Sequence, residues 1–261
     1  MADSLAAFSK SRIAPAAKRA ATPAPFNPVA RETMQERVYR ELRRAFIYGK
    51  FEPGQSLTIQ DLAKSLETST MPVRDALARL VSEQALEAMP NRSVRVPPIS
   101  AARIDDLLRA RIVVEGAALE LAAARLTPAD FEALHAANRD YSRALARRAR
   151  VAIDDELEAN RRFHFRLYEA SASPVLLPII ESLWLQSGPV VRAAVIAFDP
   201  SSQIAAPHYH AQIVAALEAG NVSAARAALA NDIGRAFDLL RSRIVATTNG
   251  NGAMKRARGK Q

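Results

Sequence analysis

Four polar side chains in the second half of this 261-residue sequence have the chemistry of a cation site. Asn160 and His164 are four residues apart, so they share one face of a predicted helix. His210 and Asp232 lie in two further segments predicted to be helical. Imidazole and carboxylate suit Zn, Ni or Mn, so the four side chains could together hold a divalent cation. From spacing alone, a surface pair or a satisfied core histidine is the commoner arrangement.

The elements that would position these side chains are helices between residues 99 and 246. Apolar periodicity predicts them at residues 100–125, 127–150, 154–170, 173 onwards, 207–219 and 221–244. The helix that starts near residue 173 can break at Gly188-Pro189. Long helices with short links form an antiparallel bundle, and its interior can hold a site. Trp184 is predicted to be core or pocket wall.

A second group of residues, nearer the N-terminus, has the pattern of a DNA-reading unit. Two short amphipathic helices with a tight turn between them are predicted within residues 57–80. Ser69 or Thr70 can cap the second helix, which then starts near Met71. An arginine one turn into a recognition helix can donate two hydrogen bonds to guanine O6 and N7. Arg74 is therefore the principal candidate for base contact.

Two adjacent short helices are more often ordinary packing than a DNA-binding motif. The segment that follows them favours the DNA-binding motif. Residues 86–89 and 93–96 are predicted to be short strands joined by a turn that contains Arg92. Val94 and Val96 then share one face, and Arg92 is left outside. Such a wing can contact phosphate or the minor groove.

The composition limits the class of protein. The hydrophobic content of 49% suffices for a core, and no apolar run is long enough to span a bilayer. The sequence lacks cysteine and an apolar signal-peptide segment, which favours a cytoplasmic protein. Most of the net charge of +9 lies in the two ends of the chain, where four basic residues face one acidic residue before position 31. The ends are therefore predicted to be a disordered basic arm and a disordered basic tail.

Residues 36–99 resemble the winged helix-turn-helix of the GntR family of bacterial transcription regulators. The matching segments are VYRELRRAFIYGKFEPGQSL, DLAKSL, MPVRDALARL and the PNR turn. The resemblance implies that Arg74 contacts DNA together with Ser69 and Thr70. Lys64, Met71 and Arg92 complete the set of predicted DNA-binding residues. Thr70, Met71 and Ser93 replace the arginine, threonine and glycine usual in the family, so the resemblance does not carry the family's usual operator sequence over to this chain.

Residues 100–245 resemble the FCD ligand-binding domain of the FadR subfamily, through RIVVEGAALELAA, NRRFHFRLYEASASP and AQIVAALEAGNVSAARAAL. The usual metal pattern of that domain is Asp-x3-His, then a histidine, then a final histidine. Asn160 takes the aspartate position and Asp232 the position of the last histidine, so one carboxylate remains. The resemblance also makes Arg111 a candidate to bind a carboxylate of an effector. A salt bridge to Glu115, one turn later, is the alternative.

These patterns predict a mainly α-helical protein with four parts. They are a disordered basic arm (1–30), a winged helix-turn-helix (31–98), a helical effector-binding and dimerisation domain (99–246) and a basic tail (247–261). The predicted function is a homodimeric regulator, in the repressor form, with no membrane segment. It would bind a double-stranded operator at the nucleoid and respond to a small carboxylate.

Two alternatives remain open at this level. One is a metal-dependent enzyme built in the helical bundle, with His164, His210 and Asp232 as ligands. The other is an architectural DNA binder that responds to no ligand.

Overall fold

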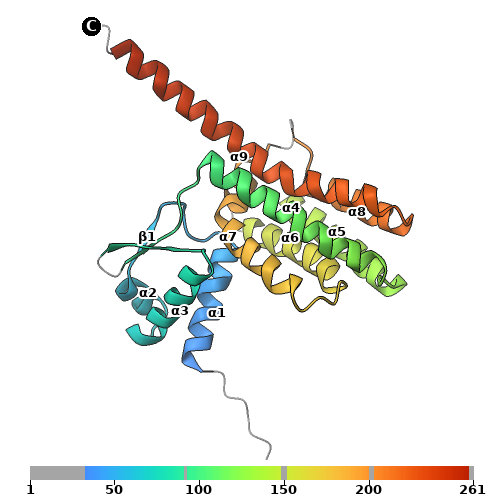
Figure 1. Cartoon of the computed structure of the whole chain (residues 1–261), viewed down its shortest axis with the longest axis horizontal. Coiled ribbons are helices and arrows are strands. Elements are labelled where there is room, and N and C mark those ends of the chain that lie inside the picture. The colour runs from blue at the N-terminus through green and yellow to red at the C-terminus, as the bar shows by residue number, and fades with distance from the viewer. Residues whose placement is uncertain (1–32, 91–92, 148–151, 200–202, 259–261) are drawn as a thin grey trace, which may run out of the picture. The chain divides into compact units, whose positions relative to one another are not determined.

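The computed structural model describes residues 33–90, 93–147, 152–199 and 203–258, and residues from Thr33 onward form one compact unit. The predicted arm at residues 1–30 and the wing residue Arg92 lie outside the described residues. Along the chain, a small group of helices and strands precedes a larger group of helices (Figure 1). The first group contains α1 (Met34–Ile47), β1 (Ser56–Leu57), α2 (Ile59–Ser65), α3 (Thr70–Ser82), β2 (Glu87–Ala88) and β3 (Val94–Arg95).

Threonine side chains define where the first two helices begin. Thr33 accepts a hydrogen bond from the backbone N–H of Glu36, and Thr58 accepts one from that of Asp61, both at 3.2 Å. Each satisfies a backbone donor that the first helical turn leaves without a partner. Ser69 occupies the N-cap position of α3 in an extended conformation, but its side chain makes no capping hydrogen bond. The predicted cap is thus in place by backbone geometry alone.

The wing is a three-stranded antiparallel sheet in the order β1-β3-β2. Val94 of β3 pairs with Leu57 of β1 and with Ala88 of β2. The sequence predicted β2 and β3 but not β1, because two residues are too few to show the alternation of a strand. Val94 and Val96 point inward and are buried, as expected from their shared face.

The second group is a bundle of helices. It contains α4 (Ala101–Ala123), α5 (Pro128–Arg147), α6 (Ala152–Glu169), α7 (Leu176–Ala197), α8 (Ala206–Glu218) and α9 (Val222–Arg258). Helix α5 packs on α6, and α9 packs on both α4 and α8. The interior is filled by large apolar side chains, among them Leu119, Leu134, Phe163, Ile180 and Phe237, each fully buried. The fold class predicted from the sequence, a winged helix-turn-helix followed by a helical bundle, is confirmed.

Helix α7 joins the two groups and is continuous through Gly188-Pro189, where the sequence allowed a break. Gly188 is buried against the end of α1, and a Cβ atom built there would lie 1.9 Å from the carbonyl oxygen of Phe46. One turn earlier, Leu185 is completely buried within the apolar core of the first group. On the outer side, Arg43 of α1 forms an ion pair with Glu181 at 2.9 Å. Glycine is therefore required at position 188 for the close approach of the two helices.

Helix α9 differs from the prediction of a disordered tail that begins at residue 247, because it continues as a helix to Arg258. The segment contains no proline. Its glycines and asparagines each lower helix propensity by about 1 kcal/mol or less, which weakens the helix without stopping it. In the described ranges, no helix has the length and apolar character needed to cross a membrane.

Candidate functional site

Three of the four predicted cation ligands meet inside the bundle. His164 of α6, His210 of α8 and Asp232 of α9 are each at most 4% exposed. Asp232 Oδ2 lies 3.0 Å from His164 Nε2 and 3.6 Å from His210 Nε2. One potential ligand atom from each residue lies within 4.8 Å of the other two. The helices thus converge on one small volume lined by imidazole and carboxylate groups.

Among the residues that the structure describes, several polar atoms of this cluster are buried without a hydrogen-bond partner. They are both ring nitrogens of His210, Asp232 Oδ1 and Asn160 Oδ1. A buried polar atom left unpaired costs about 1–3 kcal/mol, so such atoms are expected to face a bound group. Asn160 lies one helical turn before His164, which puts its orphaned oxygen on the side of α6 that carries the cluster. The donor set therefore fits a bound cation.

The protonation of His164 follows from the hydrogen bonds around it. Tyr168 donates its single hydroxyl hydrogen to Glu115, and its oxygen lies 3.0 Å from His164 Nδ1. Because Tyr168 has no second hydrogen, His164 must donate from Nδ1. In the neutral ring this leaves the lone pair on Nε2, which faces Asp232 Oδ2 at 3.0 Å. Two acceptors at that distance need either a hydrogen or a cation between them.

The separations around Asp232 match those between neighbouring ligands of a metal ion. Two ligands that each lie about 2.1 Å from a metal are about 3.0 Å apart in octahedral geometry and about 3.4 Å apart in tetrahedral geometry. The corresponding distances to Asp232 Oδ2 are 3.0 Å from His164 and 3.6 Å from His210. These side chains could ligate one ion after small movements.

Electrostatics keep two of the three groups in the form that binds metal. Burial lowers the pKa of His210 to about 4, despite the nearby Asp232, so the ring is neutral at neutral pH. For Asp232, burial alone would raise the pKa, but the adjacent imidazoles of His210 and His164 outweigh it and lower the pKa. A neutral imidazole and an ionised carboxylate are the forms that coordinate a cation. The ring of His210 also stacks on Phe163 at a centroid distance of 3.8 Å, which fixes its orientation.

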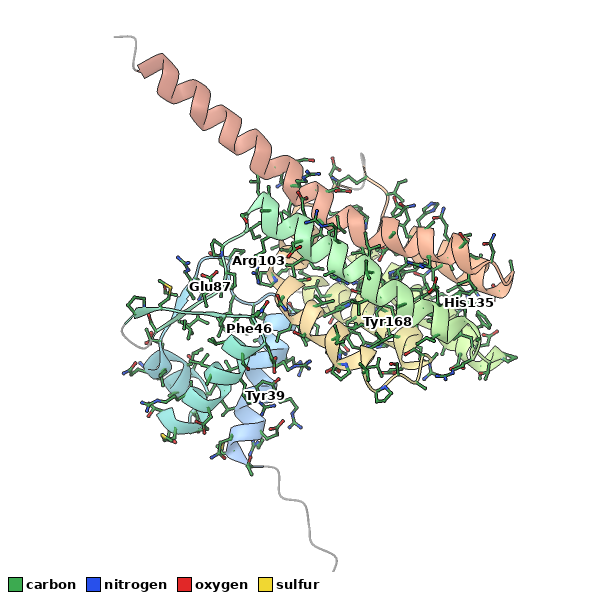
Figure 2. All side chains as sticks on the ribbon, viewed as in Figure 1. Tyr39, Phe46, Glu87, Arg103, His135 and Tyr168 are labelled. Carbon is green, nitrogen blue, oxygen red and sulfur yellow. The ribbon has the colours of Figure 1, made fainter. Side chains whose placement is uncertain are left out.

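Arg111 lies beside the cluster, but its guanidinium is already paired. Its Nε and Nη2 donate to Glu115 at 2.5 and 3.2 Å, and both residues are buried. The guanidinium also lies 4.6 Å from the ring centre of Trp184, which in turn contacts His164. The salt bridge considered from the sequence is thus present. It holds Glu115, and through it Tyr168, next to His164. Tyr168 is labelled among the bundle helices in Figure 2.

Two residues beside the cluster, Tyr168 and Arg235, were not predicted from the sequence. Tyr168 lies four residues after His164, so helical spacing would have placed it on the same face. Arg235 lies three residues after Asp232 and is only 17% exposed, with Nε 4.0 Å from Asp232 Oδ1. Arginine and tyrosine within a helix are usually surface residues or packing, so spacing alone did not distinguish them.

The predicted DNA-reading residues lie on the exposed side of α2 and α3. Lys64, Ser69, Thr70 and Arg74 are exposed, and Met71 is 57% exposed. By contrast, Arg79 lies on the Tyr39 ring and pairs with Glu36, while Arg95 of the wing pairs with Glu87. In the part of the chain that the structure describes, no ion pair engages Arg74. Its guanidinium is therefore available to an external partner.

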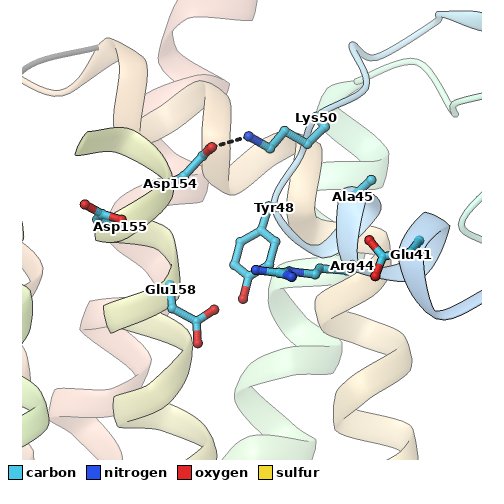
Figure 3. Close-up of a pocket in the computed structure, with 8 residues that line it drawn as sticks. All are labelled: Glu41, Arg44, Ala45, Tyr48, Lys50, Asp154, Asp155 and Glu158. Atoms are coloured by element: carbon cyan, nitrogen blue, oxygen red, sulfur yellow. Dashed lines mark hydrogen bonds and ion pairs between the residues drawn. The ribbon is translucent and has the colours of Figure 1, made fainter. Parts of the chain in front are cut away.

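A hollow of about 340 Å³ lies between α1 and α6 (Figure 3). Lys50 donates a hydrogen bond to Asp154 at its edge, and Arg192 of α7 donates to the same carboxylate at 2.7 Å. Arg192 also bonds the backbone carbonyl of Tyr48 at 3.2 Å. Asp154, on the first turn of α6, thus ties the end of α1 to the helix that carries Asn160 and His164.

Comparison with known proteins gives the same two parts. Residues 34–96 match the bacterial regulatory proteins of the gntR family, and residues 106–235 match the FCD domain. The HTH-type transcriptional regulator McbR of Escherichia coli K12 is 31% identical over 194 residues, which cover 74% of this chain and 86% of that protein. The HTH-type transcriptional repressor RspR of the same strain is 25% identical over 64% of this chain and 71% of its own length.

Solved structures agree with these sequence relatives. The structure of E. coli McbR/YncC superposes with a TM-score of 0.74 at 28% identity, over 82% of this chain and 100% of that chain. A putative GntR regulator from Rhodococcus sp. RHA1 gives a TM-score of 0.63 at 26% identity, over 79% and 97% of the two chains. The matched domains and relatives are regulators, which does not favour the enzyme alternative. The chain belongs to the GntR family of bacterial transcriptional regulators and carries an FCD domain after its winged helix-turn-helix.

Proposed function

We propose that this regulator is a homodimeric repressor whose affinity for its operator is controlled by a small carboxylate bound beside a divalent cation. The observation that carries the proposal is the buried cluster of His164, His210 and Asp232 with its orphaned polar atoms. Asn160 supplies the fourth ligand, and Zn, Ni or Mn suit such a set. The bound cation would supply a fixed positive charge that attracts an anionic ligand.

DNA recognition in this proposal belongs to the exposed end of α3. Arg74 donates to a guanine, Met71 contacts a thymine methyl group, and Ser69 and Thr70 bond phosphates. Lys64 of α2 and Arg92 of the wing add phosphate contacts. A single recognition helix reads too few base pairs to locate one site in a genome, which is why a dimer on a palindromic operator is proposed. The relative RspR is itself named a repressor, which supports that direction of control.

Helix α7 supports a route from the effector site to the DNA-binding domain. Trp184 contacts His164 and Arg111 of the site, and the next residue, Leu185, lies in the core of the DNA-binding domain. A ligand that prefers one position of these side chains biases the arrangement of the two recognition helices in the dimer. Coupling of this kind is reciprocal, so operator DNA would weaken effector binding by the same factor.

The test combines metal analysis with DNA binding. An operator is first selected from random duplexes with the purified full-length protein. Metal content, thermal midpoint and operator affinity are then measured before and after treatment with a chelator, for the wild type and for His164→Ala. His135→Ala is the matched control, because His135 is 40% exposed and pairs with Glu218 away from the cluster.

The proposal predicts about one bound ion per chain and a lower midpoint after chelation, with both effects lost in His164→Ala and kept in His135→Ala. A ligand that binds only the native state raises stability by about 2.7 kcal/mol at 100 times its Kd, so loss of the ion is readily measured. A wild type that retains no metal and does not respond to the chelator would refute the cation site. Operator binding would then stand by itself.

A further inference from the structure

We propose that Arg235 of α9, rather than Arg111, binds the carboxylate of the effector. The inference rests on the proposed function and names the residue that selects the class of ligand. Arg235 lies one turn beyond Asp232, at the boundary between the buried cluster and the surface. At this boundary, Arg235 is a basic group that an anion can reach.

The guanidinium of Arg235 has a buried donor without an acceptor. Its Nε lies 4.0 Å from Asp232 Oδ1, too far for a hydrogen bond, and makes none in the described part of the chain. Asp232 Oδ1 is also without a hydrogen bond, as is Asn160 Oδ1. The guanidinium carbon lies 6.0 Å from the ring centre of Phe198, at the outer limit of a cation–π contact. A positioned donor of this kind is suited to a carboxylate, whose two oxygens match the guanidinium fork.

Arg235 is also reachable from outside. It lines an open hollow of about 550 Å³ together with Gln203, Tyr209 and Asn231. Its side chain is 17% exposed, whereas those of Asp232 and His210 are 4% and 0% exposed. A ligand that enters from the hollow therefore meets Arg235 before it reaches the ligand atoms of the cluster.

Arg111 cannot take this role without a large loss. It is 4% exposed and bonds Glu115 through two nitrogens, and Glu115 is completely buried. Turning Arg111 toward a ligand would leave the carboxylate of Glu115 buried without its counter-charge, which is strongly unfavourable. Asp232 would not be left in this state if Arg235 turned away, because in the proposed site its carboxylate still faces the cation and lies 3.0 Å from His164.

The charges near Arg235 define the class of ligand. A divalent cation together with Arg235 outweighs the single charge of Asp232, so the site favours an anion. Beside it, Tyr141 lies 5.4 Å from His210, ring centre to ring centre, and hydrogen-bonds Glu156 at 3.2 Å. The negative charge of Glu156 disfavours a second negative group of the ligand next to Tyr141. The geometry points to a small organic acid whose carboxylate bridges the cation and Arg235 and whose remainder extends into the hollow.

The test measures carboxylate binding to the full-length protein loaded with Ni²⁺. Acetate, malonate and glutarate are titrated at constant ionic strength, with acetamide as the neutral analogue. The variants are Arg235→Gln, which removes the charge, and Arg235→Lys, which keeps the charge but loses the fork. Arg226→Gln is the control, since Arg226 lies on the same helix, is 44% exposed and pairs with Glu120.

At least one carboxylate is expected to bind the wild type and the Arg226→Gln variant equally. Its affinity should fall by about 10-fold to 100-fold in Arg235→Gln, the range for loss of a hydrogen bond to a charged group, with a smaller loss in Arg235→Lys. Ni²⁺ itself should still bind Arg235→Gln, since Arg235 is not a ligand, and this shows that the variant is folded.

Two results would overturn the inference while the cation site stands. One is a carboxylate affinity in Arg235→Gln within twofold of the wild type. The other is a wild type that binds Ni²⁺ but none of the acids. A wild type that binds no Ni²⁺ would instead contradict the cation site of the proposed function. In that case the carboxylate affinities of Arg235→Gln and the wild type are compared in the cation-free protein. A lower affinity in the variant supports the role of Arg235, and equal affinities overturn it.

Discussion

The substitution Gly188→Ala tests whether the two domains are joined by direct contact of backbones. The added Cβ atom would lie 1.9 Å from the carbonyl oxygen of Phe46, whereas ordinary contact begins at 3.4 Å. Helices α1 and α7 must therefore separate by about 1.5 Å, or the backbone must bend, and overpacking of this kind costs about 1–3 kcal/mol.

A helix-propensity gain opposes this cost only in part. Alanine is favoured over glycine in a helix by up to about 1 kcal/mol, but position 188 precedes Pro189, where a Cβ atom is disfavoured in the helical conformation. A net loss of about 1–2 kcal/mol remains. For a chain of this size the loss corresponds to a midpoint lower by about 2–8 °C.

Differential scanning calorimetry measures the effect, and Gly234→Ala is the matched control. Gly234 is also a buried helical glycine, but a Cβ atom there meets only Asp238 Oδ2, at 3.6 Å, which is an ordinary contact. Gly234→Ala should therefore raise the midpoint by a few degrees, since it gains about 0.5–1 kcal/mol. A Gly188→Ala protein as stable as the wild type would refute the close approach of α1 and α7.

Three further predictions concern single residues. Arg74→Ala should weaken binding to the selected operator by about 1–3 kcal/mol and binding to random DNA much less, as measured by fluorescence anisotropy. Equal losses of affinity for both DNAs would contradict base recognition. Tyr168→Phe removes the acceptor for His164 and should weaken Ni²⁺ binding by about 10-fold to 100-fold in calorimetric titration, with unchanged affinity counting against the assigned tautomer. Burial would raise the pKa of Asp154, but hydrogen bonds from Lys50 and Arg192 outweigh it and lower the pKa. The stability that this carboxylate contributes is therefore present above about pH 4 and is lost as the pH falls through the lowered pKa. Asp154→Asn should lower the midpoint at pH 7 slightly, because the side chain is 46% exposed. The difference from the wild type should shrink as the pH falls below about 4, and a constant difference would contradict this account.

The sequence predicted the elements that have a long periodic pattern. Helical spacing identified α4 to α9 and both helices of the DNA-reading unit, and the fold class follows from them. It also put Asn160 and His164 on one face of α6. The two-residue strand β1 was missed, since its pairing with Val94 depends on residues almost forty positions later in the chain.

Long-range contacts explain what the sequence could not supply at the site. The pairing of Arg111 with Glu115 followed from spacing as one of two options, but its burial beside Trp184 depends on residues about seventy positions later in the chain. The orphaned donor of Arg235 depends on where Asp232 and Phe198 lie in space. Tertiary packing determines such contacts, so no local sequence pattern predicts them.

The adjacency of Trp184 and Leu185 has a consequence for protein engineering. The linker Pro97-Pro98 separates the two domains in the sequence. Leu185 belongs to the second domain in the sequence, but its side chain lies in the core of the first. A chimera joined at that linker, with the effector domain of a relative, would place a foreign side chain in the buried core that contains Val73 and Leu80. Transplanting a sensor between regulators of this architecture would therefore require the Leu185 position to be exchanged together with the residues of the winged domain that surround it.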